Sequence, residues 1–354
     1  MMRVSVLRPQ AAALALCVAA GALCAWIKTP IPWMLGPLFV MALARWRGVD
    51  VEAPDGFRNG GQWLMGTALG LYFTPEMLRL VARFFPWMVV SGLFAIVMAW
   101  LCARLLTRCA GSGKSGGFKV DATTAFFSCV PGGASEMANL SERYGGRQDL
   151  VAAAQSLRIL VVVATIPFAY AAAGIHGADT YLPGTRLVEW AGLAQLLALT
   201  LAVGLLSGRT GVPNAFVLGP LFATIVLTGC GVSWSALPPW LINSGQLMIG
   251  CALGARFDQD FFHGAPRFML AAGVATLAAL GLSSGFAVAM GALAGIHWST
   301  AILALAPGGM PEMSITAKVL QLGVPVVVAF HVTRMAILVT LSGVVFRKWI
   351  KPEG

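Results

Sequence analysis

Two glutamates and two arginines stand inside apolar stretches of this 354-residue sequence. Glu136 and Glu312 belong to the motifs PGGASEM and PGGMPEM, and Arg158 and Arg334 lie in the runs AAAQSLRILVVVA and VVAFHVTRMAILV. A charge at bilayer depth costs about 2.5 to 3.5 kcal/mol on insertion scales, so it is usually paired, hydrated or neutralised by a proton. Two interpretations stay open: a structural Glu–Arg ion pair that fixes helix packing, and a site that binds a solute or a coupling ion.

The PGG motifs predict interruptions in two helices. Proline removes a backbone donor and glycine tolerates open conformations, so one half-helix ends there and another begins. The first turn of the new half-helix offers amides and a positive dipole end to an anion or a polar solute. The candidate site contains no metal and consists of both motifs, the polar residues after them and the two arginines: Pro131, Gly132, Gly133, Ser135, Glu136, Asn139, Arg158, Pro307, Gly308, Gly309, Glu312, Ser314 and Arg334.

The composition indicates an all-α polytopic membrane protein. The chain is 58% hydrophobic and 11% charged, and apolar runs long enough for spanning helices recur from residue 10 to residue 346. The net charge of +10 comes from basic residues scattered between these runs, which we interpret as orientation signals and not as a nucleic-acid surface. The seven cysteines form no CxxC pair and mostly lie within apolar runs, so we interpret them as packing residues.

The sequence is an internal duplication. LGPLF at 35–39 returns at 218–222, and GQWLMGTALGLYF at 61–73 returns as GQLMIGCALGARF at 245–257. The PGG motif returns 176 residues later, and Arg158 matches Arg334 at the same spacing. We therefore divide the chain into a first repeat at 1–180 and a second at 181–354. The GxxxG pairs inside the second motif predict close helix contacts.

The distribution of Lys and Arg predicts that the repeats are inverted. Basic residues crowd the segments 45–58 and 104–119, whereas the corresponding segments 230–243 and 291–297 contain none. Loops rich in Lys and Arg stay cytoplasmic, so corresponding loops should lie on opposite sides of the membrane. The predicted spans, five in each repeat, are 10–27, 31–46, 60–73, 85–104, 150–173, 188–206, 213–230, 244–257, 267–290 and 323–346, with one broken or re-entrant PGG segment in each repeat.

This topology places both chain termini in the cytoplasm of a bacterial cell, with the protein in the inner membrane. The apolar run after Arg3 and Arg8 resembles a signal peptide, but its counterpart in the second repeat favours retention as the first span. Arg79 and Arg83 fall on the opposite side from most basic residues, which suggests an amphipathic helix at the membrane interface. Inverted repeats of this kind are typical of secondary transporters, whose sites lie where discontinuous helices meet.

The doubled LGPLF, GQxxxGxALG and PGGxxEM pattern resembles the AbrB-type integral membrane protein family, in its duplicated form from Gram-negative bacteria. The resemblance covers nearly the whole chain and implies a multi-pass membrane protein of that family. It is distinct from the small soluble transition-state regulators that share the AbrB name. The activities attached to the family conflict, since they include regulation of gene expression, ammonia oxidation and transport.

The residues favour transport among these activities. The four histidines have no metal-ligand spacing that suits an oxygenase, and no segment forms a soluble basic module that could read DNA. GSGKS at 111–115 lacks the first glycine of a phosphate-binding loop, which disfavours a nucleotide-driven pump. We expect a secondary transporter of a small solute, such as an organic anion, and not an enzyme. The alternative is a non-transporting sensor or scaffold with an indirect role in gene regulation.

The expected partners follow from this interpretation. They are the lipid bilayer and a small molecule or ion of unknown identity. No cofactor and no direct contact with nucleic acid are expected. The sequence leaves open whether copies of the chain associate into a homo-oligomer.

Overall fold

The computed structural model describes residues 2–110, 120–177, 187–257 and 265–350. These residues form fifteen α-helices and one π-helix, and the described part of the chain contains no strand. In the first repeat the helices are α1 (Met2–Trp26), α2 (Pro32–Trp46), α3 (Phe57–Gly70), α4 (Pro75–Arg83), α5 (Phe85–Ala110), α6 (Ala122–Cys129), α7 (Ala134–Arg143) and α8 (Gln148–Ala172). In the second repeat they are α9 (Trp190–Arg209), α10 (Ala215–Gly229), α11 (Pro239–Gly254), α13 (Pro266–Ala294), α14 (Trp298–Leu305), α15 (Met310–Val319), α16 (Val324–Val345) and the π-helix η1 (Phe346–Ile350).

Each of the ten predicted spans coincides with a helix, but the helices fall into two length classes. Six described helices are long and apolar enough to cross a membrane: α1, α5, α8, α9, α13 and α16. The other four, α2, α3, α10 and α11, contain 14 to 16 residues. At about 1.5 Å per residue they extend about 21 to 24 Å, which is less than the roughly 30 Å of a hydrocarbon core. Hydrophobic runs located them correctly, but their length alone does not make them full spans.

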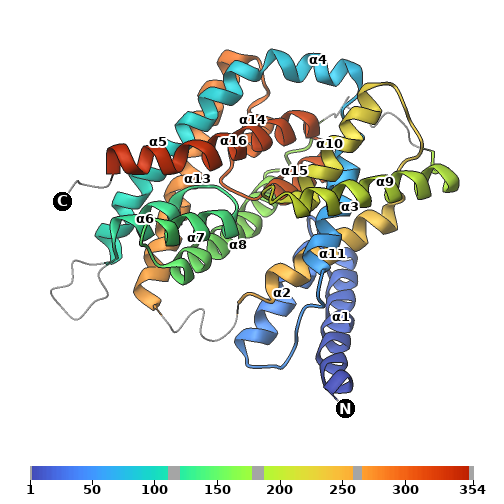
Figure 1. The fold of residues 1–354 in the computed structure, drawn as a ribbon, viewed down its shortest axis with the longest axis horizontal. Helices are drawn as coiled ribbons and strands as arrows, with labels where there is room; N and C mark the ends of the chain where they lie inside the picture. Colours follow the sequence, from blue (N-terminus) through green and yellow to red (C-terminus); the bar gives the residue numbers. More distant parts are fainter. Residues whose placement is uncertain (1, 111–119, 178–186, 258–264, 351–354) are drawn as a thin grey trace. The chain divides into compact units, whose positions relative to one another are not determined.

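The chain folds into two compact units that do not follow the two sequence repeats. One unit comprises Met1–Leu80 and His176–Phe261, and the other comprises Val81–Ile175 and Phe262–Gly354. The first unit therefore contains α1 to α3 and α9 to α11, while the second contains α5 to α8 and α13 to α16 (Figure 1). Each unit combines the same part of both repeats, so the repeats are interleaved in space. The repeat boundary near residue 180 remains a prediction from the sequence.

Glycines bring helices of different repeats together in the first unit. A Cβ on Gly66 of α3 would overlap the carbonyl oxygen of Val217 on α10. A Cβ on Gly250 of α11 would overlap the carbonyl oxygen of Met34 on α2 in the same way. Val217 and Met34 are repeat-equivalent, so these are two copies of one contact. The predicted close helix contacts of the GxxxG segments are confirmed, and their partners are helices of the opposite repeat.

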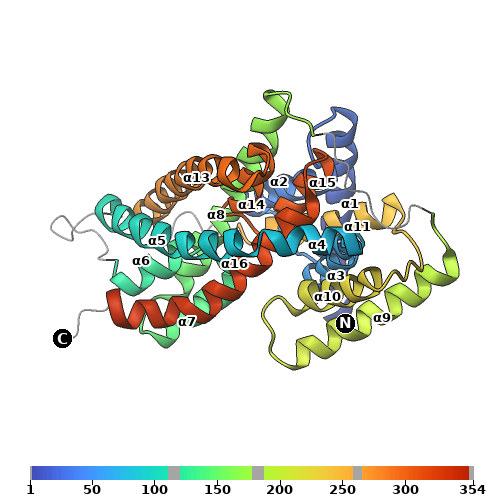
Figure 2. The same ribbon diagram turned by 90° about the horizontal axis from the view of Figure 1, so that it is seen from above.

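The second unit contains both interrupted helices and the two long helices that support them. Helix α8 packs against α6 and α7, and α16 packs against α14 and α15. Helices α5 and α13 contact each other, and α16 runs beside α5 in both views of the ribbon (Figures 1 and 2). Because α8 and α16 occupy equivalent places in the two repeats, each interruption is supported by the same kind of neighbour.

Several sequence predictions concern segments at the edges of the described residues. Arg79 and Arg83 lie on α4, a short helix with no buried residue, so the expected helix exists and its position at a membrane interface stays a prediction. The connector at 111–119, the junction at 178–186 and the terminal residues 351–354 lie outside the described residues. Whether the repeats are inverted across a membrane also stays a prediction.

Candidate functional site

The first PGG motif separates two short helices, as the sequence predicts. Helix α6 ends at Cys129, Val130 has φ −64° and ψ 122°, and α7 begins after Gly133 with φ −69° and ψ 137°. These extended angles are open to any residue, so glycine is not required for its conformational range here. It is required for space, since a Cβ on Gly132 would lie 2.8 Å from the side chain of Met137.

The second motif repeats this geometry. Helix α14 ends at Leu305, Gly309 is extended with φ −75° and ψ 151°, and α15 begins at Met310. A Cβ on Gly308 would lie 3.0 Å from Val162 on α8, so this break packs directly against the long helix of the other repeat. Neither Gly133 nor Gly309 receives a side-chain hydrogen bond as the residue preceding its half-helix.

Arg158 and Gln155 of α8 hold the first break through its carbonyl groups. The two terminal nitrogens of Arg158 donate to Val130 O at 2.9 Å and to Gly132 O at 3.1 Å. Gln155 Nε2 donates to Phe127 O at 2.7 Å, to Val130 O at 2.9 Å and, more weakly, to Ser128 O at 3.3 Å. Both side chains are buried, with Arg158 3% and Gln155 0% exposed. The carbonyls freed by the interruption therefore have donors inside the protein.

Arg334 and His331 of α16 hold the second break in the same way. Arg334 donates to Leu305 O at 3.2 Å, Ala306 O at 2.7 Å and Gly308 O at 3.2 Å. It also lies 2.9 Å from His331 Nδ1, and His331 Nε2 lies 3.0 Å from Leu303 O. Because a guanidinium can only donate, Nδ1 accepts and Nε2 carries the proton that Leu303 O receives. The ring is therefore neutral and fixed in one tautomer.

The two arrangements are equivalent by sequence position as well as by geometry. Every donor and acceptor of the second break stands 176 residues after its counterpart, with histidine in place of glutamine at the inner donor. The carbonyl end of a helix carries partial negative charge, so a guanidinium placed there is stabilised while it satisfies buried acceptors. The sequence predicted the arginines but not Gln155 and His331, although their matching distance of three residues before each arginine was an available signal.

The glutamates differ in their surroundings. Glu312 is 6% exposed, and its carboxylate folds back over Gly309 at the start of α15. It also lies close enough to Arg158 to act on it electrostatically. Glu136 is half-buried, and its Oε2 has no hydrogen-bond partner among the described residues. The structure thus brings Glu312 and Arg158 of different repeats together, whereas it gives Glu136 no such relation to either arginine.

The remaining predicted residues divide into exposed and buried members. Ser135 and Asn139 on α7 are exposed, and Asn139 Oδ1 accepts a hydrogen bond of 3.0 Å from Gln148. Ser314 on α15 is fully buried, and its hydroxyl has no partner among the described residues. Pro131 and Pro307 are buried at the interruptions. Among the described residues, no group of three His, Cys, Asp or Glu side chains is placed to hold a metal ion.

The arrangement has a defined chemical capacity. The hydrogen-bonding edges of both guanidinium groups are occupied by backbone carbonyls, so their first role is to hold the breaks. The first turns of α7 and α15 present backbone amides that no side chain caps. Amides at the positive end of a helix bind anions or polar groups, and the neighbouring carboxylates can bind a proton or a cation. These groups suit reversible binding of a small solute.

Comparisons with known proteins agree with this multi-pass architecture. A family profile described as "Transition state regulatory protein AbrB" matches residues 3–115 and 33–350. "Uncharacterized protein YhjN" of Bacillus subtilis (strain 168) is 26% identical over 353 residues, covering 93% of this chain and 90% of that protein. "Putative regulator AbrB" of Escherichia coli (strain K12) is 24% identical over 323 residues, covering 89% of each chain. The similarity therefore extends through both repeats.

Proposed function

Because the chain belongs to the AbrB family and holds two interrupted helices in one compact unit, we propose that it is a secondary transporter of a small solute. The solute is of the organic-anion class and binds at the two breaks. The observation that carries the proposal is the paired set of Arg158 and Arg334, each of which holds a broken helix through its carbonyls. Nonhelical backbone inside a membrane is tolerated where protein buries it or where it lines a cavity.

The anion class is favoured by the two helix starts that follow the breaks. Helices α7 and α15 begin after Gly133 and Gly309 with no side-chain cap, so their first-turn amides remain available to a ligand. The positive end of a helix dipole adds to the attraction. The first turn of α15 contains Pro311, which has no N–H, whereas Ser135 at the same place in α7 supplies both an amide and an exposed hydroxyl. The start of α7 is therefore the richer donor.

The proposed setting is the inner membrane of a bacterium, with inverted repeats and both termini in the cytoplasm. Six long apolar helices among the described residues support a membrane location. The uneven distribution of Lys and Arg supports the orientation. In a secondary transporter, such a pair of repeats lets one compact unit move against the other around a central site.

A non-transporting sensor or scaffold is the second candidate. It is favoured by the printed name of the Escherichia coli relative, "Putative regulator AbrB". A sensor would use the two clamped breaks as rigid structure and would not move solute across a bilayer. Solute flux into sealed vesicles therefore discriminates the two functions.

The test begins with a thermal-shift screen of the purified protein against organic acids, since a ligand that binds only the folded state raises the unfolding temperature. Each hit is then measured for uptake into proteoliposomes that contain the protein. A transporter gives saturable uptake above that of empty vesicles. Ligands that stabilise the protein without any uptake would overturn transport and favour the sensor.

Substitution of Glu312 separates a structural role from a role in binding. If Glu312 serves as the counter-charge of Arg158, Glu312→Gln lowers the folded yield, and adding Arg158→Gln restores part of it. If Glu312 binds the solute or a coupling ion, Glu312→Gln folds but loses ligand stabilisation or its pH dependence, and the second substitution restores neither. A folded Glu136→Gln, Glu312→Gln double variant with unchanged ligand response would show that the glutamates are not part of the site.

A further inference from the structure

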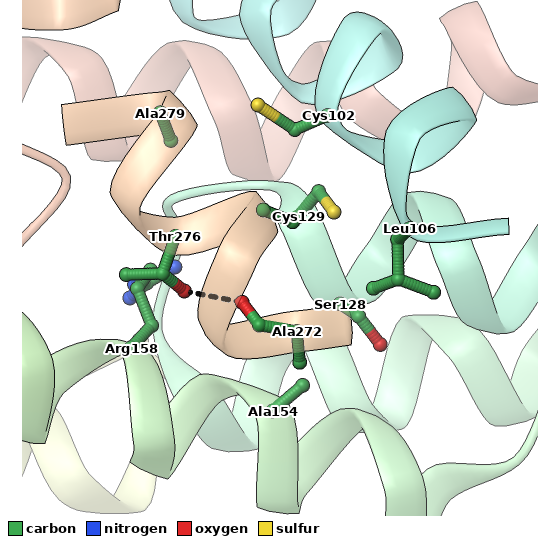
Figure 3. Close-up of a pocket in the computed structure, with 10 residues that line it drawn as sticks. Cys102, Leu106, Ser128, Cys129, Ala154, Arg158, Ala272, Thr276 and Ala279 are labelled. Atoms are coloured by element: carbon green, nitrogen blue, oxygen red, sulfur yellow. Dashed lines mark hydrogen bonds between the residues drawn. The ribbon is translucent and has the colours of Figure 1, made fainter. Parts of the chain in front are cut away.

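A small buried cavity lies behind the first break, inside the second compact unit. Its volume is about 10 Å³, and it is lined by residues from α5, α6, α8 and α13. A space of this size holds about one water-sized particle. In Figure 3 the side chain of Arg158 rises from α8 toward Thr276 of α13, while Ser128 and Cys129 come from the end of α6. Alanines form much of the remaining wall.

Two hydrogen-bond donors at this cavity have no partner among the described residues. Arg158 uses both terminal nitrogens for the carbonyls of the break, but its Nε is buried and unpartnered. The hydroxyl of Ser128, a residue 4% exposed, is also buried and unpartnered. The Thr276 hydroxyl, in contrast, donates to Ala272 O at 2.8 Å within its own helix, the bond drawn in Figure 3. Buried donors are expected to bind an acceptor.

The charges around the cavity do not balance. Among the described residues, the buried charged side chains are Arg158, Arg334 and Glu312, and the buried ring of His331 is neutral. The two arginines lie near enough to repel each other, and Glu312 acts on Arg158. Glu136 is half-buried and is not among the charges that act on either arginine. Carbonyl dipoles reduce the cost of the guanidinium groups, but they do not cancel a full charge.

We propose that this cavity binds one monovalent anion of halide size, with chloride as the natural occupant, beside Arg158. The anion accepts from the Nε–H of Arg158 and the hydroxyl of Ser128 and neutralises the surplus positive charge. A water molecule also fits the volume, but it leaves that charge uncompensated. An organic acid is too large for the cavity, so this site is separate from the proposed solute site. The inference does not depend on transport.

The first experiment measures chloride-36 binding to the purified full-length protein, together with its thermal unfolding in chloride and in gluconate at equal ionic strength. We expect one bound chloride per chain and an unfolding temperature that rises saturably with chloride. Bromide substitutes for chloride, whereas gluconate does not. An unfolding temperature that is the same in both salts, with no bound chloride-36, would overturn the proposal and assign a water molecule to the cavity.

Variants locate the site. Ala275→Val places extra methyl groups in the cavity and abolishes the chloride dependence. Ser128→Ala removes one donor to the anion and weakens chloride binding at least about tenfold, as expected for a hydrogen bond to a charged group. Ser342→Ala is the matched control, because Ser342 is a fully buried serine of α16 that also lacks a described partner and does not line this cavity. Equal chloride binding in Ser128→Ala and Ser342→Ala would place the anion elsewhere and refute the site, even if Ala275→Val does not fold.

Discussion

Replacing Arg158 with methionine tests whether the arginines hold the interrupted helices. Methionine keeps a long flexible side chain but donates no hydrogen bond. In the native protein Arg158 donates to Val130 O at 2.9 Å and to Gly132 O at 3.1 Å, and it is 3% exposed. The variant therefore removes both bonds from a region that water does not reach.

The expected loss follows from what each carbonyl retains. Val130 O still accepts from Gln155, so its loss is partial, whereas the Arg158 bond is the side-chain donor to Gly132 O. A hydrogen bond to a charged group contributes about 1.5 to 3 kcal/mol, and an unsatisfied buried acceptor costs about 1 to 3 kcal/mol. Removing the guanidinium also relieves the cost of burying its charge, which offsets part of the loss. We expect Arg158→Met to reduce the free energy of unfolding by about 2 to 4 kcal/mol.

Equilibrium unfolding in mixed detergent micelles measures this difference, and Arg147→Met provides the control. Arg147 lies in the same compact unit, but its ion pair with Asp149 is exposed, with side-chain accessibilities of 50% and 62%. Exposed pairs contribute about 0 to 1 kcal/mol, so the control should unfold almost as the native protein does. Arg158→Lys should fall between, because an ammonium group does not span both carbonyls. Equal stabilities of Arg158→Met and Arg147→Met would refute the clamp.

Two further predictions concern the first unit and the topology. Gly66→Leu should abolish folded yield because its side chain meets the backbone of α10, whereas Gly285→Ala, at a helical glycine of α13 with open space around it, should raise the stability by about 0.4 to 1 kcal/mol; equal yields of both variants in size-exclusion chromatography would contradict the predicted close packing. In single-cysteine variants that keep one of the two exposed native thiols, an impermeant reagent should label Cys230 in intact spheroplasts and Cys109 only after lysis, and labelling of both from outside would rule out inverted repeats.

The candidate site was predictable only in part. Glu312 and Arg158 were identifiable because a charge within an apolar run has few structural explanations. Their proximity was not identifiable, since it depends on α15 packing against a helix of the other repeat. The sequence also suggested that each glutamate would pair with an arginine, but it could not show that backbone carbonyls occupy both guanidinium edges. Those acceptors exist only once the interruption has a defined backbone path.

Hydrophobic runs and repeated motifs determined the class, the helices, the duplication and the positions of the two breaks, because these features depend on local composition and chain geometry. Only the tertiary structure decided how the repeats are divided between compact units. A helix such as α3 exposes glycines that could contact several partners, and the backbone of α10 was selected by packing over the whole unit. The same holds for the cavity beside Arg158, whose walls come from four helices distant in sequence. Its shape follows from how their small side chains fit together, and a linear pattern contains no record of that fit.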